Sequence, residues 1–266
     1  FSELGSELVT NGDFASNIDN WAAKDCTIVW DNGKLKCDNS SGNSNGGARQ
    51  NVGLQNSKTY KLVATVQILS ADSNGTFNLF TSSAGGTGQS SVYSGSTLVA
   101  GGDAVTETAY FTTGTDGDVS IQFSVDVSNA IYTIDNVSVK QVDPNDRWTL
   151  GTGWGYGDGV ASCDGTQTSA SSLVQDIGTS ANNKVYKIQF TLSNRTAGGV
   201  RIYLGGHNAG TVRSANGTYT ELITASSSST NASIYFEGDA SFVGTLDNVS
   251  VVEVQGDRPR LSYDIT

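Results

Sequence analysis

One segment of this sequence occurs twice, and this repeat constrains the fold more than any other feature. Residues 133–142 read TIDNVSVKQV and residues 245–254 read TLDNVSVVEV, so Asp135 and Asp247 lie 112 residues apart (247 − 135). Self-similarity at a long spacing is typical of a chain that contains two copies of one structural unit. The sequence therefore predicts two similar units that end in the same strand, rather than one fold built from all 266 residues.

The segments before these closing strands also align. Trp21 lies ten residues before Asp31 (31 − 21), and Trp148 lies ten residues before Asp158 (158 − 148). KTYKLVATVQI in the first half then matches KVYKIQFTLSN in the second half. The two tryptophans are expected to belong to the cores of the two units.

The repeat predicts where the units begin and end. Their boundary is expected at the DPN segment, residues 143–145, which contains one of the two prolines of the chain. We expect the first unit at residues 1–142, the second at residues 146–254, and a C-terminal linker or tail at residues 255–266.

Every segment of both units has the pattern of a β-strand. In YKLVATVQI, for example, Leu62, Ala64, Val66 and Ile68 alternate with the residues between them. Short alternating runs that are broken by Asn-Gly, Asp-Gly and Gly-Gly pairs are typical of antiparallel strands joined by tight turns. The sequence therefore predicts an all-β protein of two tandem antiparallel β-sandwiches of the jelly-roll type, with roughly eight or nine strands in each.

Charge and hydropathy exclude several classes of partner. The formal net charge is −11, whereas a nucleic-acid backbone is bound through a basic surface. No apolar run approaches the roughly 20 residues that cross a bilayer. We therefore expect neither nucleic acid nor membrane as a partner. The chain has no Met and begins with Phe1, so we expect either a removed leader or a piece of a longer protein whose other domains are partners.

The three cysteines leave two alternatives open. Cys26 and Cys37 flank a predicted hairpin turn at residues 31–33, so a disulfide between them is one alternative. Buried thiols in strands are the other and the better one, because an odd count is not a disulfide framework. The repeat places Cys37 opposite Cys163.

No catalytic pattern is visible in the sequence. His207 is the only histidine, and no Ser–His–Asp pattern accompanies it, although a general base needs a partner that orients it. Glu107, Glu221 and Glu237 are possible carboxylates for glycoside hydrolysis, but no motif selects two of them. We therefore expect a protein that is not an enzyme.

One face of the second unit has the composition of a binding surface. Alternation points six apolar residues inward: Ile188, Phe190, Ile202, Leu204, Ile234 and Phe236. Since neighbouring side chains on a strand point to opposite faces, the residues between them are expected to face outward together. The predicted ligand-binding residues on this face are Gln189, Arg201, Tyr203, Tyr235 and Glu237.

This mixture of side chains suits a sugar. Aromatic rings stack on the apolar face of a pyranose, and planar amide, carboxylate and guanidinium groups bond adjacent hydroxyls. The alternative is that these are ordinary exposed strand residues, since Tyr has a high strand propensity. The corresponding face of the first unit is expected to be poorer: Thr65, Gln67, Asn78, Phe80, Gln122 and Ser124. Further aromatic residues are expected near the turns: Trp30, Trp154 and Tyr156.

The first half of the chain resembles a known family in three segments. LVTNGDF followed by NIDNW, then YKLVATVQ, then IDNVSV resemble the jelly-roll carbohydrate-binding modules of the clan that contains families four, nine and twenty-two. The resemblance covers most of residues 8–142 and, more weakly, residues 146–254. It implies a structural calcium ion that is held by the closing Asp and by a Glu after the Phe of the opening motif.

Carried over to this chain, the resemblance names Asp135 and Asp247 as calcium ligands. The position after Phe14 is Ala15, so the Glu ligand is missing, and Asp13 is the expected substitute. In the second unit Asp247 matches but the opening motif is absent. We expect at least one calcium ion, nearer Asp13 and Asp135.

A second resemblance concerns biological context. GTGWGYGDGVASCDGTQTSASSLVQ and the tail RPRLSYDIT resemble segments of bacteriophage tail and fibre proteins. Together these observations predict a non-catalytic protein that binds a polysaccharide or cell-surface glycan, located outside the cell or at a virion surface. The alternative is a structural spacer or decoration module of a virion with no ligand of its own.

Overall fold

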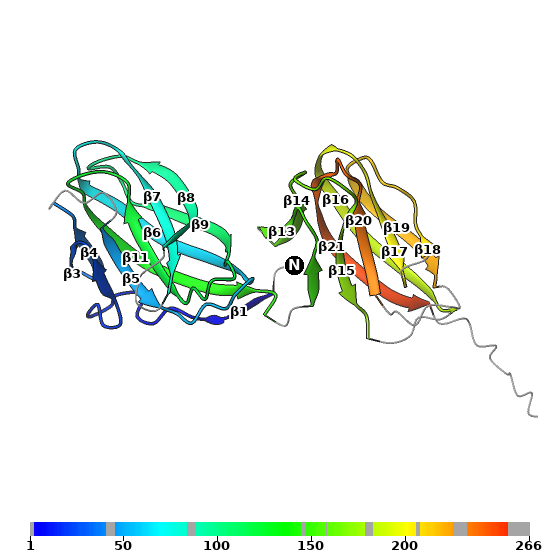
Figure 1. The fold of residues 1–266 in the computed structure, drawn as a ribbon, viewed down its shortest axis with the longest axis horizontal. Helices are drawn as coiled ribbons and strands as arrows, with labels where there is room; N and C mark the ends of the chain where they lie inside the picture. The colour runs from blue at the N-terminus through cyan, green and yellow to red at the C-terminus, as the bar shows by residue number, and fades with distance from the viewer. Residues whose placement is uncertain are drawn as a thin grey trace, which may run out of the picture. The chain divides into compact units, whose positions relative to one another are not determined.

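The structure is a computed structural model, and it describes residues 3–40, 46–83, 89–144, 147–157, 159–178, 183–205, 208–225 and 233–254. The chain divides into two compact units, of which the first is Glu3–Pro144 and the second begins at Asn145 (Figure 1). The described residues form strands and turns but no helix, so none of them forms a helix that could cross a membrane. This confirms the predicted all-β class. The predicted tail at 255–266 and His207 lie outside the described residues.

The N-terminal unit is a sandwich of two antiparallel sheets. One sheet has the strand order β3-β4-β11-β6-β9, with β1 also paired to β11, and the other has the order β2-β5-β10-β7-β8. The strands are β1 (Leu4–Glu7), β2 (Ala22–Lys24), β3 (Thr27–Asp31), β4 (Lys34–Asp38), β5 (Gly47–Asn51), β6 (Thr59–Ser70), β7 (Gly75–Ser82), β8 (Ser90–Leu98), β9 (Val105–Thr112), β10 (Ser120–Val125) and β11 (Ile131–Val142).

The C-terminal unit is a second sandwich. Its sheets have the orders β13-β14-β21-β16-β19 and β12-β15-β20-β17-β18. The strands are β12 (Trp148–Leu150), β13 (Trp154–Gly157), β14 (Val160–Cys163), β15 (Ser171–Asp176), β16 (Val185–Ala197), β17 (Val200–Leu204), β18 (Asn208–Ala209), β19 (Gly217–Thr224), β20 (Ser233–Gly238) and β21 (Val243–Val254). Each unit has more than eight or nine strands because short edge strands such as β2, β3, β12 and β13 add to the longer ones.

Apart from β1, which has no counterpart among the described strands of the second unit, the two units have the same sheet order. β11 lies between β4 and β6, and β21 lies between β14 and β16, so the two repeated closing segments occupy equivalent central places. Cys37 pairs with Tyr132, three residues before Asp135, and Cys163 pairs with Gly244, three residues before Asp247. The alignment of Cys37 with Cys163 and of the two closing motifs therefore holds residue by residue.

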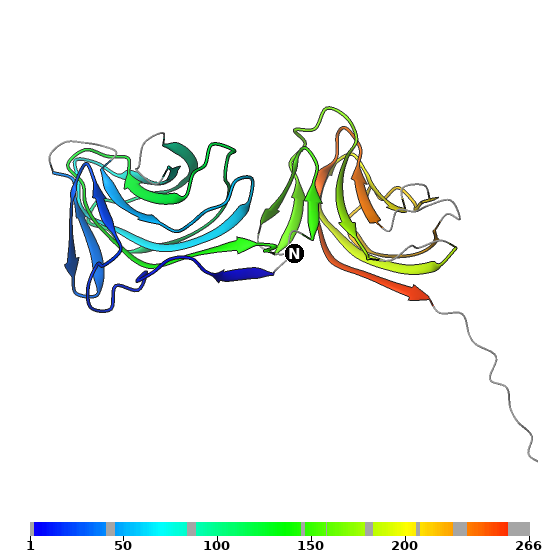
Figure 2. The same cartoon turned by 60° about the horizontal axis from the view of Figure 1, so that its bottom comes forward.

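The repeated Asp-Asn pair forms a β-bulge in each closing strand. Asp135 pairs with Thr65 and Ser138 with Val63, so β11 advances three residues while β6 advances two (138 − 135 against 65 − 63). β21 makes the same step between Asp247 and Ser250. The extra residue of a bulge bends a strand and increases its twist. Figure 2 shows the resulting bend of β21, the orange-red strand of the C-terminal unit.

Each unit has its own hydrophobic core between its two sheets. In the N-terminal unit Trp21 is buried and packs between Phe14 and Phe123, with ring centroids 5.5 and 5.8 Å apart. In the C-terminal unit the half-buried Trp148 packs against Phe236, with centroids 6.2 Å apart. The two tryptophans therefore contribute to the cores, as the repeat predicted.

Candidate functional site

The outer surface of one C-terminal sheet carries four of the five predicted ligand-binding residues. Arg201 and Tyr203 lie on β17, and Tyr235 and Glu237 lie on the neighbouring strand β20. We call this set of four residues the C-terminal face. The strands present it outward because the alternating residues Ile202, Leu204, Ile234 and Phe236 are 0% exposed in the core.

The four side chains are adjacent in the sheet. Arg201 pairs with Glu237 across the two strands, and Tyr203 pairs with Tyr235. The Arg201 Nη2 and Nε atoms donate hydrogen bonds to Glu237 Oε1 at 2.9 and 3.2 Å. The Arg201 guanidinium carbon also lies 4.6 Å from the centroid of the Tyr203 ring. Tyr203, Arg201 and Glu237 thus hold one another in place and form an ordered, half-buried polar and aromatic surface.

Gln189 does not belong to this face, and the prediction that it lies beside the other four residues is wrong. It is on β16, which is in the other sheet of the sandwich. Alternation correctly indicates that Gln189 points away from the core, but the outer surfaces of the two sheets are on opposite sides of the unit. The same error affects Thr65 and Gln67, which lie on β6 in the sheet that does not contain Phe80 and Gln122.

The N-terminal unit has an equivalent surface on its β2-β5-β10-β7-β8 sheet. Gln122 pairs with Phe80 and Ser124 with Asn78, as Tyr235 pairs with Tyr203 and Glu237 with Arg201 in the C-terminal unit. We call Asn78, Phe80, Gln122 and Ser124, together with the neighbours that follow, the N-terminal face. These neighbours are Lys24, Arg49, Ser82 and Gln89.

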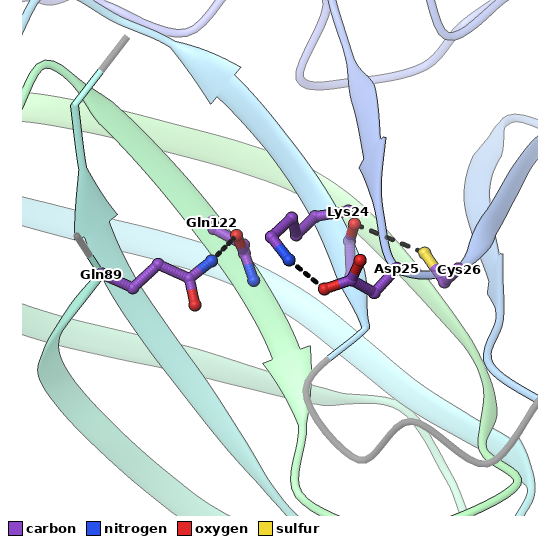
Figure 3. Close-up of polar contacts among 6 residues, drawn as sticks. Lys24, Asp25, Cys26, Gln89 and Gln122 are labelled. Carbon is purple, nitrogen blue, oxygen red and sulfur yellow. Dashed lines mark hydrogen bonds and ion pairs between the residues drawn. The ribbon is translucent and has the colours of Figure 1, made fainter. Parts of the chain in front are cut away.

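The neighbours come from adjacent elements of the same sheet. Arg49 of β5 pairs with Gln122, and Lys24 of β2 pairs with Gly47, which in turn pairs with Ser124. Gln89, just before β8, donates a hydrogen bond from its amide to Gln122 Oε1, and Lys24 forms an ion pair with Asp25 (Figure 3). Lys24 and Arg49 were not predicted for this face, because their place depends on the pairing of β2 with β5 and of β5 with β10.

Several polar side chains of the N-terminal face are buried although they point away from the core. Gln122 and Ser124 are 0% exposed. The hydroxyl oxygens of Ser82 and Ser124 are buried and have no hydrogen-bond partner among the described residues. A buried hydroxyl without a partner is unfavourable unless water or a ligand supplies the missing bond. This face is therefore more enclosed and more polar than its sequence suggested.

The three additional aromatic residues have different surroundings. Trp154 is buried, packs against Phe242 with centroids 5.7 Å apart, and donates its indole N–H to the Ser171 carbonyl. Trp154 is thus a core residue rather than a ligand contact at a turn. Tyr156 is half-buried, and Trp30 is 44% exposed, with its indole N–H donated to the Phe14 carbonyl at 2.7 Å.

The three glutamates considered for hydrolysis are each held by other groups. Glu107 is buried and accepts hydrogen bonds from the Tyr93 hydroxyl at 2.9 Å and from Ser96. Burial first, and then the hydrogen bond to Glu107, raise the pKa of Tyr93. Glu221 is bound by Arg213, with Nη2 2.8 Å from Oε1, at the edge of a pocket of about 440 Å³ between β18 and β19.

The calcium ligands named by resemblance are at the bulges. The backbone N–H of Val137 donates to the Gly12 carbonyl at 2.8 Å, so the turn that carries the exposed Asp13 lies beside the Asp135 bulge. Asp135 Oδ1 already accepts the N–H of Asn136 at 2.7 Å, and Asp247 Oδ1 accepts the N–H of Asn248 at 2.6 Å.

Side chains alone do not complete a calcium shell here. Among the described residues no three His, Cys, Asp or Glu side chains gather as a metal site would need. Because Ca²⁺ takes 6–8 oxygens, backbone carbonyls would have to supply most of the shell. Two carboxylates near one turn are compatible with the ion, and the calcium site stays a prediction.

Comparison with known proteins gives one sequence similarity. A family model described as a carbohydrate binding domain matches residues 6–130, just under half of the 266 residues. No curated protein sequence matches the chain.

Solved structures with a similar arrangement are distant in sequence. The tandem CBM22-1–CBM22-2 domain of Paenibacillus barcinonensis Xyn10C is 10% identical, with a TM-score of 0.44, and the match covers 96% of this chain and 99% of that one. The second N-terminal cellulose-binding domain of Cellulomonas fimi β-1,4-glucanase C is 21% identical, with a TM-score of 0.37, over 52% of this chain and 95% of that one. These scores are too low for conclusions about a ligand.

Proposed function

We propose that the chain binds carbohydrate without catalysing a reaction, through the C-terminal face and through its counterpart, the N-terminal face. The observation that carries the proposal is that both units hold aromatic and planar polar side chains on the same outward surface of the same sheet. The match of a carbohydrate-binding-domain model to residues 6–130 supports it for the N-terminal unit.

On the C-terminal face, Glu237 and Arg201 are suited to bond sugar hydroxyls. The ion pair leaves Glu237 Oε2 and part of the guanidinium group able to engage neighbouring hydroxyls in a fixed plane. Tyr203 and Tyr235, which pair across β17 and β20, supply the ring surface on which we expect a pyranose to stack. Because the ion pair already holds the Arg201 and Glu237 side chains in place, these side chains lose less conformational entropy when a ligand binds.

On the N-terminal face, Ser82 and Ser124 are buried, so the half-buried Asn78 and Phe80 are the side chains suited to contact an uncharged polyhydroxyl ligand. A sugar hydroxyl both donates and accepts, so it can bond either the carbonyl or the amino group of the Asn78 amide. Phe80 supplies the aromatic ring at the position that Tyr203 takes in the other unit. A neutral glycan also suits a chain of net charge −11 better than a strongly anionic one.

Retention on polysaccharide gels and glycan arrays tests this function. One aromatic stack is worth about 1 kcal/mol, so Tyr235→Ala or Phe80→Ala is expected to weaken binding by about fivefold or more. Gln189→Ala, on the opposite sheet, and Tyr110→Ala, on β9, are the matched controls and should bind as the parent does. All four variants are expected to melt within a few degrees of the parent.

Failure of the intact chain to bind any polysaccharide would favour the second candidate, a structural spacer. In that case the Arg201–Glu237 ion pair would only stabilise the sheet and would not contact a ligand.

We further propose an extracellular location, since a glycan-binding chain of this charge would act there. A parent protein from a phage tail or fibre stays a prediction of the sequence resemblance.

We also propose a structural calcium ion between Asp13 and Asp135. When bound, it would neutralise the two carboxylates and tie the Gly12–Asp13 turn to the closing strand. Addition of a chelator should lower the melting temperature of the parent but not that of Asp135→Asn. If the parent has the same melting temperature with and without chelator, the proposed calcium site is wrong.

A further inference from the structure

Cys26 lies where the chain crosses from one sheet of the N-terminal unit to the other. β2 ends at Lys24 in one sheet, and β3 begins at Thr27 in the other. Asp25 makes the bend with a φ of 54°, a left-handed conformation. Cys37 is on β4, where it pairs with Ile28 of β3 and faces the core.

Ile28, two residues after Cys26, pairs with Cys37, and Cys26 packs against the core cluster that contains Cys37. Both are free thiols in the structure. Cys26 Sγ also lies 3.4 Å from the Gly47 carbonyl oxygen, to which it donates. Glycines make room for this corner. A Cβ atom on Gly46 would lie 2.6 Å from the Asp25 carbonyl oxygen, and one on Gly47 would lie 3.0 Å from the Tyr132 hydroxyl.

The two thiols have different reactivity. Cys26 is half-buried, and the hydrogen bond from Cys37 lowers its pKa, although burial acts in the opposite direction. Burial raises the pKa of Cys37, which is 0% exposed. Because the thiolate is the attacking form, Cys26 is the group that an external reagent would meet first.

The C-terminal unit provides an internal comparison. Its cysteine at the place of Cys37 is Cys163, which is also buried. The strand pairing that sets Ile28 beside Cys37 sets Trp154 beside Cys163, which places Thr152 at the position of Cys26. The side chain that meets Cys163 is Gln167, with Sγ 3.3 Å from Oε1. The buried strand cysteine of the N-terminal unit, Cys37, therefore has a second cysteine nearby, whereas Cys163 of the C-terminal unit has the amide of Gln167.

We propose that Cys26 and Cys37 form a disulfide in oxidising surroundings, which ties the crossing between the two sheets to β4. A low-molecular-weight disulfide is the oxidant. The Cys26 thiolate attacks one sulfur of the oxidant, breaks its S–S bond and releases one thiolate. Cys37, after losing its proton, attacks the Cys26 sulfur and releases the second. Two electrons pass to the oxidant, which leaves as two thiols with the two protons.

The test is thiol counting on the full chain after incubation with oxidised glutathione. After denaturation, one reactive thiol should remain, that of Cys163, and peptide mapping should find the Cys26 and Cys37 peptides joined. Cys163→Ser should then show no reactive thiol. The oxidised parent should melt at a higher temperature than the reduced parent, because the bond restricts the unfolded chain.

Cys26→Ser is the matched control, since the half-exposed side chain is replaced by one of similar size. It should keep its other thiols reactive and melt at the same temperature with and without oxidant. If this variant does not fold, the thiol count and peptide map of Cys163→Ser decide alone. Three reactive thiols in the oxidised parent, or a crosslink that includes Cys163, would overturn the proposal.

Discussion

At the scale of the residue, backbone geometry explains why the Asp-Asn pair occurs in both closing strands. Asn136 and Asn248 have φ values of 49° and 53°, in the left-handed region that Gly and Asn tolerate better than other residues. The preceding carboxylate accepts the N–H of each Asn. The motif therefore encodes a bulge at the same place in both closing strands, whether or not a metal ion binds beside it.

The left-handed position predicts a clear order among variants of Asn248. Asn248→Gly should leave the free energy of unfolding nearly unchanged, because Gly adopts this conformation readily. Asn248→Val should lower it by about 1–2 kcal/mol, since a β-branched side chain is strained there. Urea unfolding measures both, with Ser250→Val on the same strand as the control. Equal stability of the Gly and Val variants would contradict the conformational explanation.

At the scale of the element, one carboxylate ties two turns of the C-terminal unit together. Asp239 follows β20, and its Oδ1 accepts hydrogen bonds from the N–H and hydroxyl of Ser241, both at 2.9 Å. Its Oδ2 accepts the N–H of Gly199, between β16 and β17, at 2.7 Å. Partial burial alone would raise the pKa of Asp239, but these hydrogen bonds and the charge of Arg195 lower it.

The lowered pKa gives a pH-dependent contribution with a defined sign. The stabilisation by Asp239 is present above the unfolded-state pKa of about 4 and is lost as pH falls through the lower folded-state pKa. Asp239→Asn should therefore lower the free energy of unfolding at neutral pH, by at most about 1 kcal/mol for so exposed a group. The difference from the parent should shrink near pH 3, about one unit below that unfolded-state pKa. A difference that is the same at both pH values would assign the effect to something other than the carboxylate charge.

At the scale of the whole molecule, the chain is two sandwiches with separate cores. Every sheet is built from the strands of one unit only, and the two core clusters share no residue. Tandem binding units in one chain raise the apparent affinity for a repeating ligand, because the second binding event is intramolecular. The proposed function therefore gains from the repeat even if each face binds weakly.

Separate cores predict that the units fold independently. Chains of residues 3–144 and 147–254, produced separately, should each unfold in one cooperative transition. Calorimetry of the full chain should show transitions at the melting temperatures of the two pieces. If neither piece folds alone, the two cores are less independent than the strand pairing indicates.

The sequence by itself determined the class, the repeat and the direction of most side chains. Alternation placed Ile202, Leu204, Ile234 and Phe236 in a core, and all four are fully buried, because side-chain direction on a strand is a local property with a period of two residues. The closing strands were found from their motif for a similar reason, since a bulge with a left-handed Asn is specified by adjacent residues.

Only the tertiary structure decided which side chains share a surface. Gln189 and Arg201 both point away from the core, yet they lie on opposite sheets, because sheet membership depends on which distant strands pair. The enclosure of Ser124 and the contact of Cys26 with the Gly47 carbonyl also depend on segments that are not neighbours along the chain. Local pattern fixes the orientation of each residue, whereas long-range pairing brings residues together into a site.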